Sequence, residues 1–162
     1  MELNRKEART LVYEMLFEAD FRSDDSPEAI FDTARSVRDI PSDDYIDAVF
    51  YGVTEHKAEL DARIEGCSNG WKASRISRPA ITAMRIAVFE MLYSRDIPYS
   101  VSINEAVELV KKYDDDKARA FVNGVLNKVK DNIAAEASPE VLAVKGKTFK
   151  KKSSPTQRKE ND

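Results

Sequence analysis

The sequence predicts an all-α protein, a compact bundle of about six to seven helices. Apolar residues recur at intervals of three and four along most of its 162 residues, which is the spacing of one helix face. No segment alternates apolar and polar residues as a half-buried strand would. Proline and small polar residues punctuate the chain where helices are expected to begin. The length suits one domain, or two small helical halves that share a core.

The first half of the chain predicts three helices. Residues 4–21 give the clearest amphipathic pattern, and Asn4 can cap them because its side-chain oxygen accepts a backbone N–H. A short helix is expected after Ser26, since Pro27 is tolerated at a first helical position. A longer third helix is expected from a cap at Ser42 to Ile64. The three apolar faces consist of Ala8, Leu11, Val12, Met15, Leu16 and Ala19; Ile30, Phe31, Ala34 and Val37; and Tyr45, Ile46, Val49, Phe50, Val53, Leu60 and Ile64.

The second half predicts a buried helix and two amphipathic ones. Residues 80–93 are apolar on nearly all sides, so this helix is expected at the centre of the bundle. Its Arg85 needs a partner, preferably a carboxylate from another helix, because an unpaired buried charge is costly. Ser102 and Glu105 fit a capping box at the start of the next helix. The last helix is expected at about 117–133, and its Gly124 is interpreted as a place where a neighbouring helix approaches closely.

Residues 138–162 are expected to form a disordered basic tail, of which 138–144 can add one helical turn. The tail holds seven Lys/Arg and three Asp/Glu residues, whereas residues 1–137 hold 19 and 26. The body is therefore anionic. Any contact with a polyanion must be local, near the N-terminus, near 117–119 or in the tail.

Composition excludes several classes of function. No apolar run approaches the roughly 18 residues that span a bilayer, and the N-terminus lacks a secretory signal, so no membrane association is expected. The single Cys67 cannot form an internal disulfide, which together with the missing signal predicts a cytoplasmic protein. One cysteine and one histidine leave no zinc site, and no Gly-rich cofactor loop occurs. Neither Cys67 nor His56 has the partners of a catalytic residue, so we expect no metal, no cofactor and no catalysis.

Basic and aromatic residues raise the possibility of RNA binding. Arg5 and Arg9 lie four apart and, with Lys6, are expected on a face of the first helix away from its apolar stripe. Such a face can contact phosphates, although a solvated face balanced by acidic neighbours is the more frequent explanation. Phe17 and Phe121 can stack on unpaired bases or, as their periodicity favours, pack in the core. Lys117 and Arg119 supply positive charge beside Phe121, while Trp71 is interpreted as a loop anchor.

Three stretches together resemble the NusB family of bacterial transcription antitermination factors. They are ARTLVYEMLFEAD (8–20), MRIAVFEMLYSRDIPYSVSINEAVELVKKY (84–113) and FVNGVLNKV (121–129). The resemblance covers about residues 4–133. It implies one non-catalytic helical domain at 1–137, with subdomains at about 1–65 and 77–137.

The resemblance also implies partners and site residues. NusB proteins pair with NusE, a small-subunit ribosomal protein, bind the single-stranded boxA segment of nascent ribosomal RNA transcripts and act in the RNA polymerase antitermination complex. The family's RNA surface carries over to Arg5, Lys6, Arg9, Lys117 and Phe121, with Phe17 as an addition and Arg119 beside them. Near the NusE contact this chain has Arg75 and Arg78 where relatives often carry acids, so these two are the expected partner-binding residues.

Two other functions are compatible with the sequence. A helical adaptor that binds protein but lacks specific RNA recognition would share the fold. An isolated domain related to those preceding the catalytic part of some ribosomal RNA methyltransferases would also share it, although no cofactor-binding α/β unit is expected in this chain. Homodimerisation, which some NusB proteins show, is left open.

Overall fold

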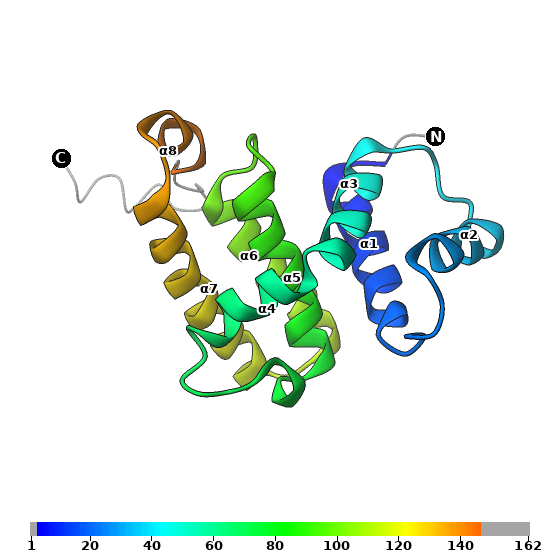
Figure 1. Ribbon diagram of the computed structural model, residues 1–162, viewed down its shortest axis with the longest axis horizontal. Coiled ribbons are helices and arrows are strands. Elements are labelled where there is room, and N and C mark those ends of the chain that lie inside the picture. Colours follow the sequence, from blue (N-terminus) through cyan, green and yellow to red (C-terminus); the bar gives the residue numbers. More distant parts are fainter. Residues whose placement is uncertain (1–2, 147–162) are drawn as a thin grey trace, which may run out of the picture.

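The computed structural model describes residues 3–146 and confirms the all-α prediction. No strand occurs in that range. Figure 1 shows α1, α2 and α3 at one end of the molecule and α6, α7 and α8 at the other, with α5 between them. The elements are α1 (Arg5–Ala19), α2 (Pro27–Val37), α3 (Asp44–Glu55), α4 (Lys57–Glu65), the 3₁₀ turn η1 (Ala73–Arg75), α5 (Arg78–Tyr93), α6 (Tyr99–Tyr113), α7 (Asp116–Glu136) and α8 (Pro139–Lys145).

Side-chain oxygens begin most of these helices. Each accepts a hydrogen bond from a first-turn backbone N–H, which otherwise has no partner within the helix. At α1 the bond is reciprocal, because Glu7 accepts from the backbone N–H of Asn4 while Asn4 accepts from that of Glu7. The capping residues of α1, α2, α3, α5, α7 and α8 are Asn4, Ser26, Asp43, Ser77, Asp115 and Ser138. The cap of α3 is thus one residue later than the sequence predicted.

The long third helix expected from the sequence is divided into α3 and α4 at His56. His56 stacks on Tyr93 of α5, with 4.6 Å between the ring centroids. Beyond this point α4 buries Leu60 and Ile64 and packs on α5 and α7. The part of the chain assigned to the first subdomain by the sequence therefore packs on the second. The division into subdomains stays a prediction.

The central position predicted for α5 is confirmed. Twelve successive residues from Ala80 to Met91 are buried, and both α1 and α3 pack on this helix. Arg85 finds the carboxylates that its burial requires: Asp61 of α4 lies 2.7 Å from its Nε, and Asp20 lies 3.2 Å from its Nη1. These ion pairs connect α5 with α4 and with the end of α1. Arg85, a charged residue in an otherwise apolar helix, therefore links three elements.

The capping box expected at Ser102 and Glu105 does not form. α6 begins earlier, at Tyr99, so both residues lie inside the helix. Ser102 Oγ donates a hydrogen bond of 2.7 Å to Glu90 of α5, and Glu105 Oε1 lies 3.3 Å from Lys6 Nζ of α1. The two side chains join α6 to its neighbours instead of satisfying its own backbone.

The helical turn that the sequence allowed at residues 138–144 is confirmed, with Ser138 as its cap. α8 forms there, and Lys145 at its end is only 2% exposed. Lys145 Nζ donates hydrogen bonds to the backbone oxygens of Glu90, Ser94 and Ile97, at 3.1, 2.6 and 2.5 Å. These carbonyls at and after the end of α5 gain a cationic partner, which anchors α8. Burial lowers the pKa of Lys145 to about 8. Residues 147–162 of the predicted tail lie outside the described residues.

Two glycines have opposite packing environments. A Cβ added to Gly124 of α7 would meet no atom within 4 Å, so the predicted close helix contact at this position is wrong. A Cβ added to Gly52 of α3 would instead overlap the buried ring of Phe89 of α5. Gly52 is therefore the glycine that permits a close approach between helices.

Substitution of each glycine by alanine tests this difference. Gly124→Ala is expected to raise the free energy of unfolding by about 0.5–1 kcal/mol, because alanine favours the helix and nothing opposes its methyl group. Gly52→Ala is expected to lower it by about 1–3 kcal/mol, since the ring must move in a packed core. Urea unfolding of the two variants measures both changes. Equal changes of the same sign would contradict the assignment.

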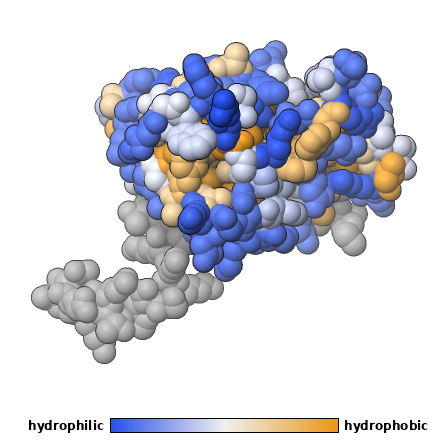
Figure 2. Space-filling view, turned by 90° about the horizontal axis from the view of Figure 1, so that it is seen from below, coloured by the Kyte–Doolittle hydropathy of each residue, from blue (hydrophilic) through white to orange (hydrophobic). Residues whose placement is uncertain are grey.

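The surface agrees with a well-solvated protein. The face seen from below in Figure 2 is mainly hydrophilic, with hydrophobic residues visible between the hydrophilic ones. Across residues 3–146, none of the helices combines the length and the apolar character needed to cross a bilayer.

Candidate nucleic-acid interface

The start of α1 presents two exposed cations, as the sequence predicted. Arg5 holds its guanidinium carbon 4.5 Å from the centroid of the Tyr45 ring, a cation–π contact that orients the side chain across the start of α3. The Lys6 side chain is 65% exposed, and its Nζ lies 3.3 Å from Glu105 of α6. Both cations are accessible to a phosphate, although Lys6 already has an internal carboxylate beside it.

Arg9 does not share their exposure, so its predicted place on a solvent-facing basic surface is wrong. The residue is 4% exposed, and its Nε donates a hydrogen bond of 2.8 Å to Glu90, which is fully buried. α1 packs on both α3 and α5, so residues beside its apolar face, including Arg9, are also buried. The signal for this pairing was Glu90 itself, an acidic residue in a nearly all-apolar helix that needs a cation.

Glu90 is the centre of a buried polar network. Besides Arg9, it accepts hydrogen bonds from Tyr45 Oη at 2.5 Å and from Ser102 Oγ at 2.7 Å. Burial and the adjacent Glu90 carboxylate raise the pKa of Tyr45, so this hydroxyl remains a donor. The network connects α1, α3, α5 and α6 below the first turns of α1, and it fixes the backbone from which Arg5 and Lys6 project.

A second group of predicted residues lies at a groove of about 410 Å³ beside the start of α7. Lys117 is exposed, and Phe121 is half-buried with its ring along the groove wall. Arg75 of η1 lines the same groove. Trp71, interpreted from the sequence as a loop anchor, is 52% exposed and also lines it. The groove therefore combines two aromatic rings and two cations with the carboxylates of Asp114 and Asp115.

Local backbone features place Trp71 there. Asn69 and Gly70 before it adopt positive φ angles of 51° and 87°, which reverse the chain after α4. Ser77 Oγ donates a hydrogen bond of 2.6 Å to Asp114, tying the start of α5 to the turn between α6 and α7. These constraints bring the loop after α4 against the start of α7. Spacing along the sequence could not have shown this, because the two segments are about forty residues apart.

The remaining predicted residues lie elsewhere. Arg119 is partly buried and forms an ion pair with Asp116 of its own helix. Phe17 is partly buried against the core and stands in an aromatic row on α1, 6.1 Å from the ring of Tyr13 and 5.5 Å from that of Phe21. Neither residue lines the groove beside α7.

The two expected partner-binding residues are separated. Arg75 lines the groove with Trp71, whereas Arg78 lies over the ring of Phe21, with 4.7 Å between guanidinium carbon and centroid. Arg78 also pairs with Asp20 at 3.2 Å. Phe21 itself is 63% exposed, so the end of α1 presents an apolar ring next to a cation.

α6 runs from a contact with the start of α1 to the start of α7. Glu105 contacts Lys6 at the start of α1, and the ring of Tyr113 stacks 5.1 Å from that of Tyr13 farther along α1. The start of α7 follows Tyr113 directly. A helix rises about 1.5 Å per residue, so Glu105 and Tyr113 are about 12 Å apart along α6. The first turn of α1 and the start of α7 therefore lie near different parts of α6.

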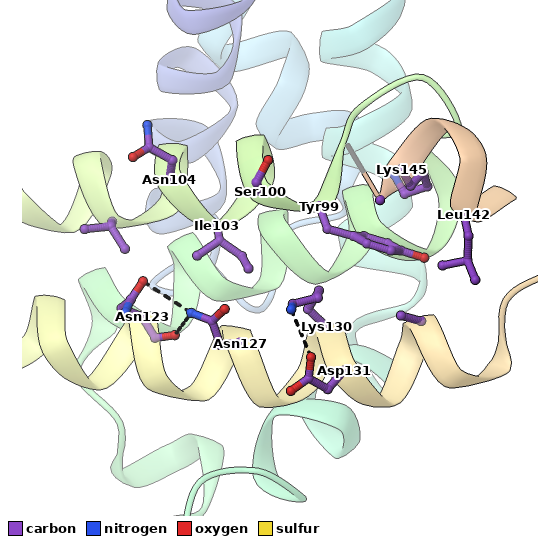
Figure 3. Close-up of a pocket in the computed structure, with 13 residues that line it drawn as sticks. Tyr99, Ser100, Ile103, Asn104, Asn123, Asn127, Lys130, Asp131, Leu142 and Lys145 are labelled. Carbon is purple, nitrogen blue, oxygen red and sulfur yellow. Dashed lines mark hydrogen bonds and ion pairs between the residues drawn. The ribbon is translucent and has the colours of Figure 1, made fainter. Parts of the chain in front are cut away.

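A different groove, of about 620 Å³, lies between α6, α7 and α8 (Figure 3). Asn127 Nδ2 donates a hydrogen bond of 2.8 Å to the backbone oxygen of Asn123, and Lys130 pairs with Asp131 at 2.9 Å. None of the predicted site residues lines this groove. Between residues 3 and 146, no group of three or more His, Cys, Asp or Glu side chains could hold a metal ion.

The chain is similar to known proteins over most of its length. A sequence model described as the NusB family matches residues 6–131. The transcription antitermination protein NusB of Enterococcus faecalis is 42% identical over 146 residues, which cover 84% of this chain and 95% of that protein. The protein of the same name from Bacillus velezensis is 41% identical over 131 residues, covering 81% and 98%.

Solved structures share the fold. NusB of T. maritima superposes with a TM-score of 0.71 at 30% identity, covering 81% of this chain and 93% of that one. A chain in a structure described as the antitermination factors NusB and NusE in complex with dsRNA superposes with a TM-score of 0.70 at 28% identity. It covers 79% of this chain and 96% of its own length.

Proposed function

Because the chain belongs to the NusB family, we propose that it is a non-catalytic transcription antitermination factor of the cytoplasm. In this role it binds the boxA segment of nascent ribosomal RNA transcripts together with NusE, within the antitermination complex of RNA polymerase. The relatives named as antitermination proteins and the solved complex of NusB and NusE with RNA support this role.

The observation that carries the proposal is the groove beside α7. Trp71 and Phe121 offer ring faces around one depression of the surface, where Arg75 and Lys117 stand beside the carboxylates of Asp114 and Asp115. Stacking of unpaired bases on aromatic side chains is the usual way in which proteins bind single-stranded RNA. A duplex hides its base faces, so these rings favour a single-stranded ligand. Lys6 and Arg5 at the start of α1 would contact its phosphates.

NusE is assigned to the end of α1. Phe21 is an exposed aromatic ring partnered by Arg78, and aromatic residues and arginine are enriched in protein–protein interfaces. This surface is next to the groove beside α7, because Arg75 lines that groove and Arg78, which contacts Phe21, is only three residues later in the chain. Two partners bound side by side would complete the RNA surface of a chain that is anionic as a whole.

Titration with boxA RNA, with and without NusE, tests the function. The double variant Lys6→Glu/Lys117→Glu is expected to weaken RNA binding at least about 10-fold and to flatten the log–log salt dependence by about 1.4, since two phosphate contacts are lost. NusE affinity is expected to stay unchanged. The matched control is Lys130→Glu/Arg95→Glu, the same charge change on the side of α8.

The outcome distinguishes the alternative role. If the wild-type chain binds NusE but boxA RNA gains no affinity from the pair, the chain is a helical adaptor and the RNA assignment is wrong. If the control double variant loses as much affinity as the test variant, net charge and not the proposed surface determines binding.

A further inference from the structure

We propose that the groove between α1 and α6 is a phosphate subsite, held in the free protein by the carboxylate of Glu105. A backbone phosphate of the bound RNA takes the place of that carboxylate. This inference rests on the proposed function and assigns residues of α6 to it, which the sequence did not suggest.

The groove has a volume of about 320 Å³ and an excess of positive charge. Its polar lining comprises four cations and two carboxylates, whereas residues 1–137 as a whole hold 19 Lys/Arg and 26 Asp/Glu. A local cationic groove on an anionic body attracts an anion to that position and to few others. The charged residues of the lining are Lys6, Arg9, Lys111, Lys112, Glu105 and Glu108.

Arg9 brings an unsatisfied donor to this groove. Its Nε bonds to Glu90, and its Nη1 lies 3.7 Å from Glu105, which is too long for a hydrogen bond. Its Nη2 is buried and has no hydrogen-bond partner within residues 3–146. A buried charged donor without an acceptor is costly. A phosphate has several oxygens in the geometry that a guanidinium fork matches, so it satisfies this donor better than one carboxylate does.

In the free protein, the carboxylate of Glu105 occupies the position where that phosphate would bind. Its Oε1 is 3.3 Å from Lys6 Nζ and 3.7 Å from Arg9 Nη1, so one oxygen neutralises two cations. Its side chain is 18% exposed, compared with 4% for that of Arg9. A rotation about its flexible side-chain bonds would release both cations from this carboxylate. RNA must therefore displace an internal anion, which lowers its affinity and disfavours weakly charged ligands.

Neutralisation of Glu105 tests the exchange. In the full chain, Glu105→Gln is expected to raise the affinity for boxA RNA about 3- to 10-fold. It is also expected to steepen the log–log salt dependence by about 0.7, because one more cation becomes available to phosphate. Glu108→Gln is the matched control: it removes an equal charge from the same groove, but Glu108 has no ion pair with α1 in the described structure. Equal gains for the two variants would overturn the subsite.

A second measurement separates this inference from the proposed function. Pyrophosphate is added to the wild type and to Glu105→Gln without RNA, and the side-chain nitrogen resonances of Arg9 and Lys6 are followed by NMR. We expect saturable shifts, at lower pyrophosphate concentration in the variant. If RNA binds but these resonances do not respond in either protein, the subsite is refuted and the function stands. If pyrophosphate shifts them but boxA RNA does not bind, the subsite stands and the function is refuted.

Discussion

Replacement of Arg9 by methionine is expected to lower the free energy of unfolding by about 3–5 kcal/mol, the largest stability change that we expect from any cation of α1. Methionine keeps most of the volume of arginine but removes the charge that faces Glu90, 2.8 Å away and fully buried. The carboxylate would then keep only neutral hydroxyl donors. Chemical denaturation of the variant measures the loss.

Arg5→Met is the matched control, one helical turn earlier on the same helix. Arg5 is exposed and contributes only a surface cation–π contact, so its loss is expected to cost about 0.5–1 kcal/mol. The double variant Arg9→Met/Glu90→Met is expected to recover a large part of the loss, because apolar pairs replace buried ion pairs well. Arg9→Met with wild-type stability would show that the ion pair does not support the fold.

This expectation changes how RNA-binding experiments on α1 are interpreted. A variant of Arg9 that loses RNA affinity can do so because the Glu90 network collapses and the first turns of α1 move. Substitutions at Lys6 and Glu105 leave that network in place and are the better probes of phosphate contact.

Removal of the indole of Trp71 is expected to reduce affinity for boxA RNA about 5- to 150-fold, the largest change in binding that we expect from a single substitution. Base stacking on an aromatic side chain contributes about 1–3 kcal/mol per base. Trp71 is half-exposed in a loop, so Trp71→Ala should change stability little. Because no charge is removed, the slope of affinity against salt should equal that of the wild type.

Phe21→Ala is the control for this prediction. Phe21 is also an exposed aromatic residue, but it lies beside Arg78 at the end of α1. Its removal is expected to weaken NusE binding and to leave the affinity for RNA alone unchanged. If both aromatic variants lose RNA affinity equally, the groove is not the stacking site. Phe121→Ala is less informative, because its half-buried ring also packs on the core.

Several features of the fold were predictable from local pattern. The apolar spacing of residues 8–19 located α1, and the nearly all-apolar stretch at 80–93 identified the central helix. The demand of Arg85 for a carboxylate from another helix followed from its burial, and Asp61 and Asp20 meet it. In each case the composition and periodicity of one segment were sufficient to predict that it would be buried, because both are properties of the segment's own sequence.

Candidate site residues were predicted less completely. Lys6 and Lys117 are exposed as expected, since solvation of a lysine is the default outcome for a surface position. Arg9 is buried because an acid 81 positions later faces it, and Trp71 forms a groove with Phe121 because a loop folds against a distant helix. Such pairings depend on how helices cross, which periodicity does not encode.

By itself, then, the sequence determined the helical class, the central helix, the anionic body and the resemblance that pointed to RNA. Tertiary structure alone decided which polar groups meet: Arg9 with Glu90, Glu105 with Lys6, and Lys145 with the end of α5. The physical reason is that an apolar face is selected by hydrophobic burial, which acts on the average character of a segment. A polar contact requires two specific atoms within about 3 Å, and only the packed arrangement of helices fixes that distance.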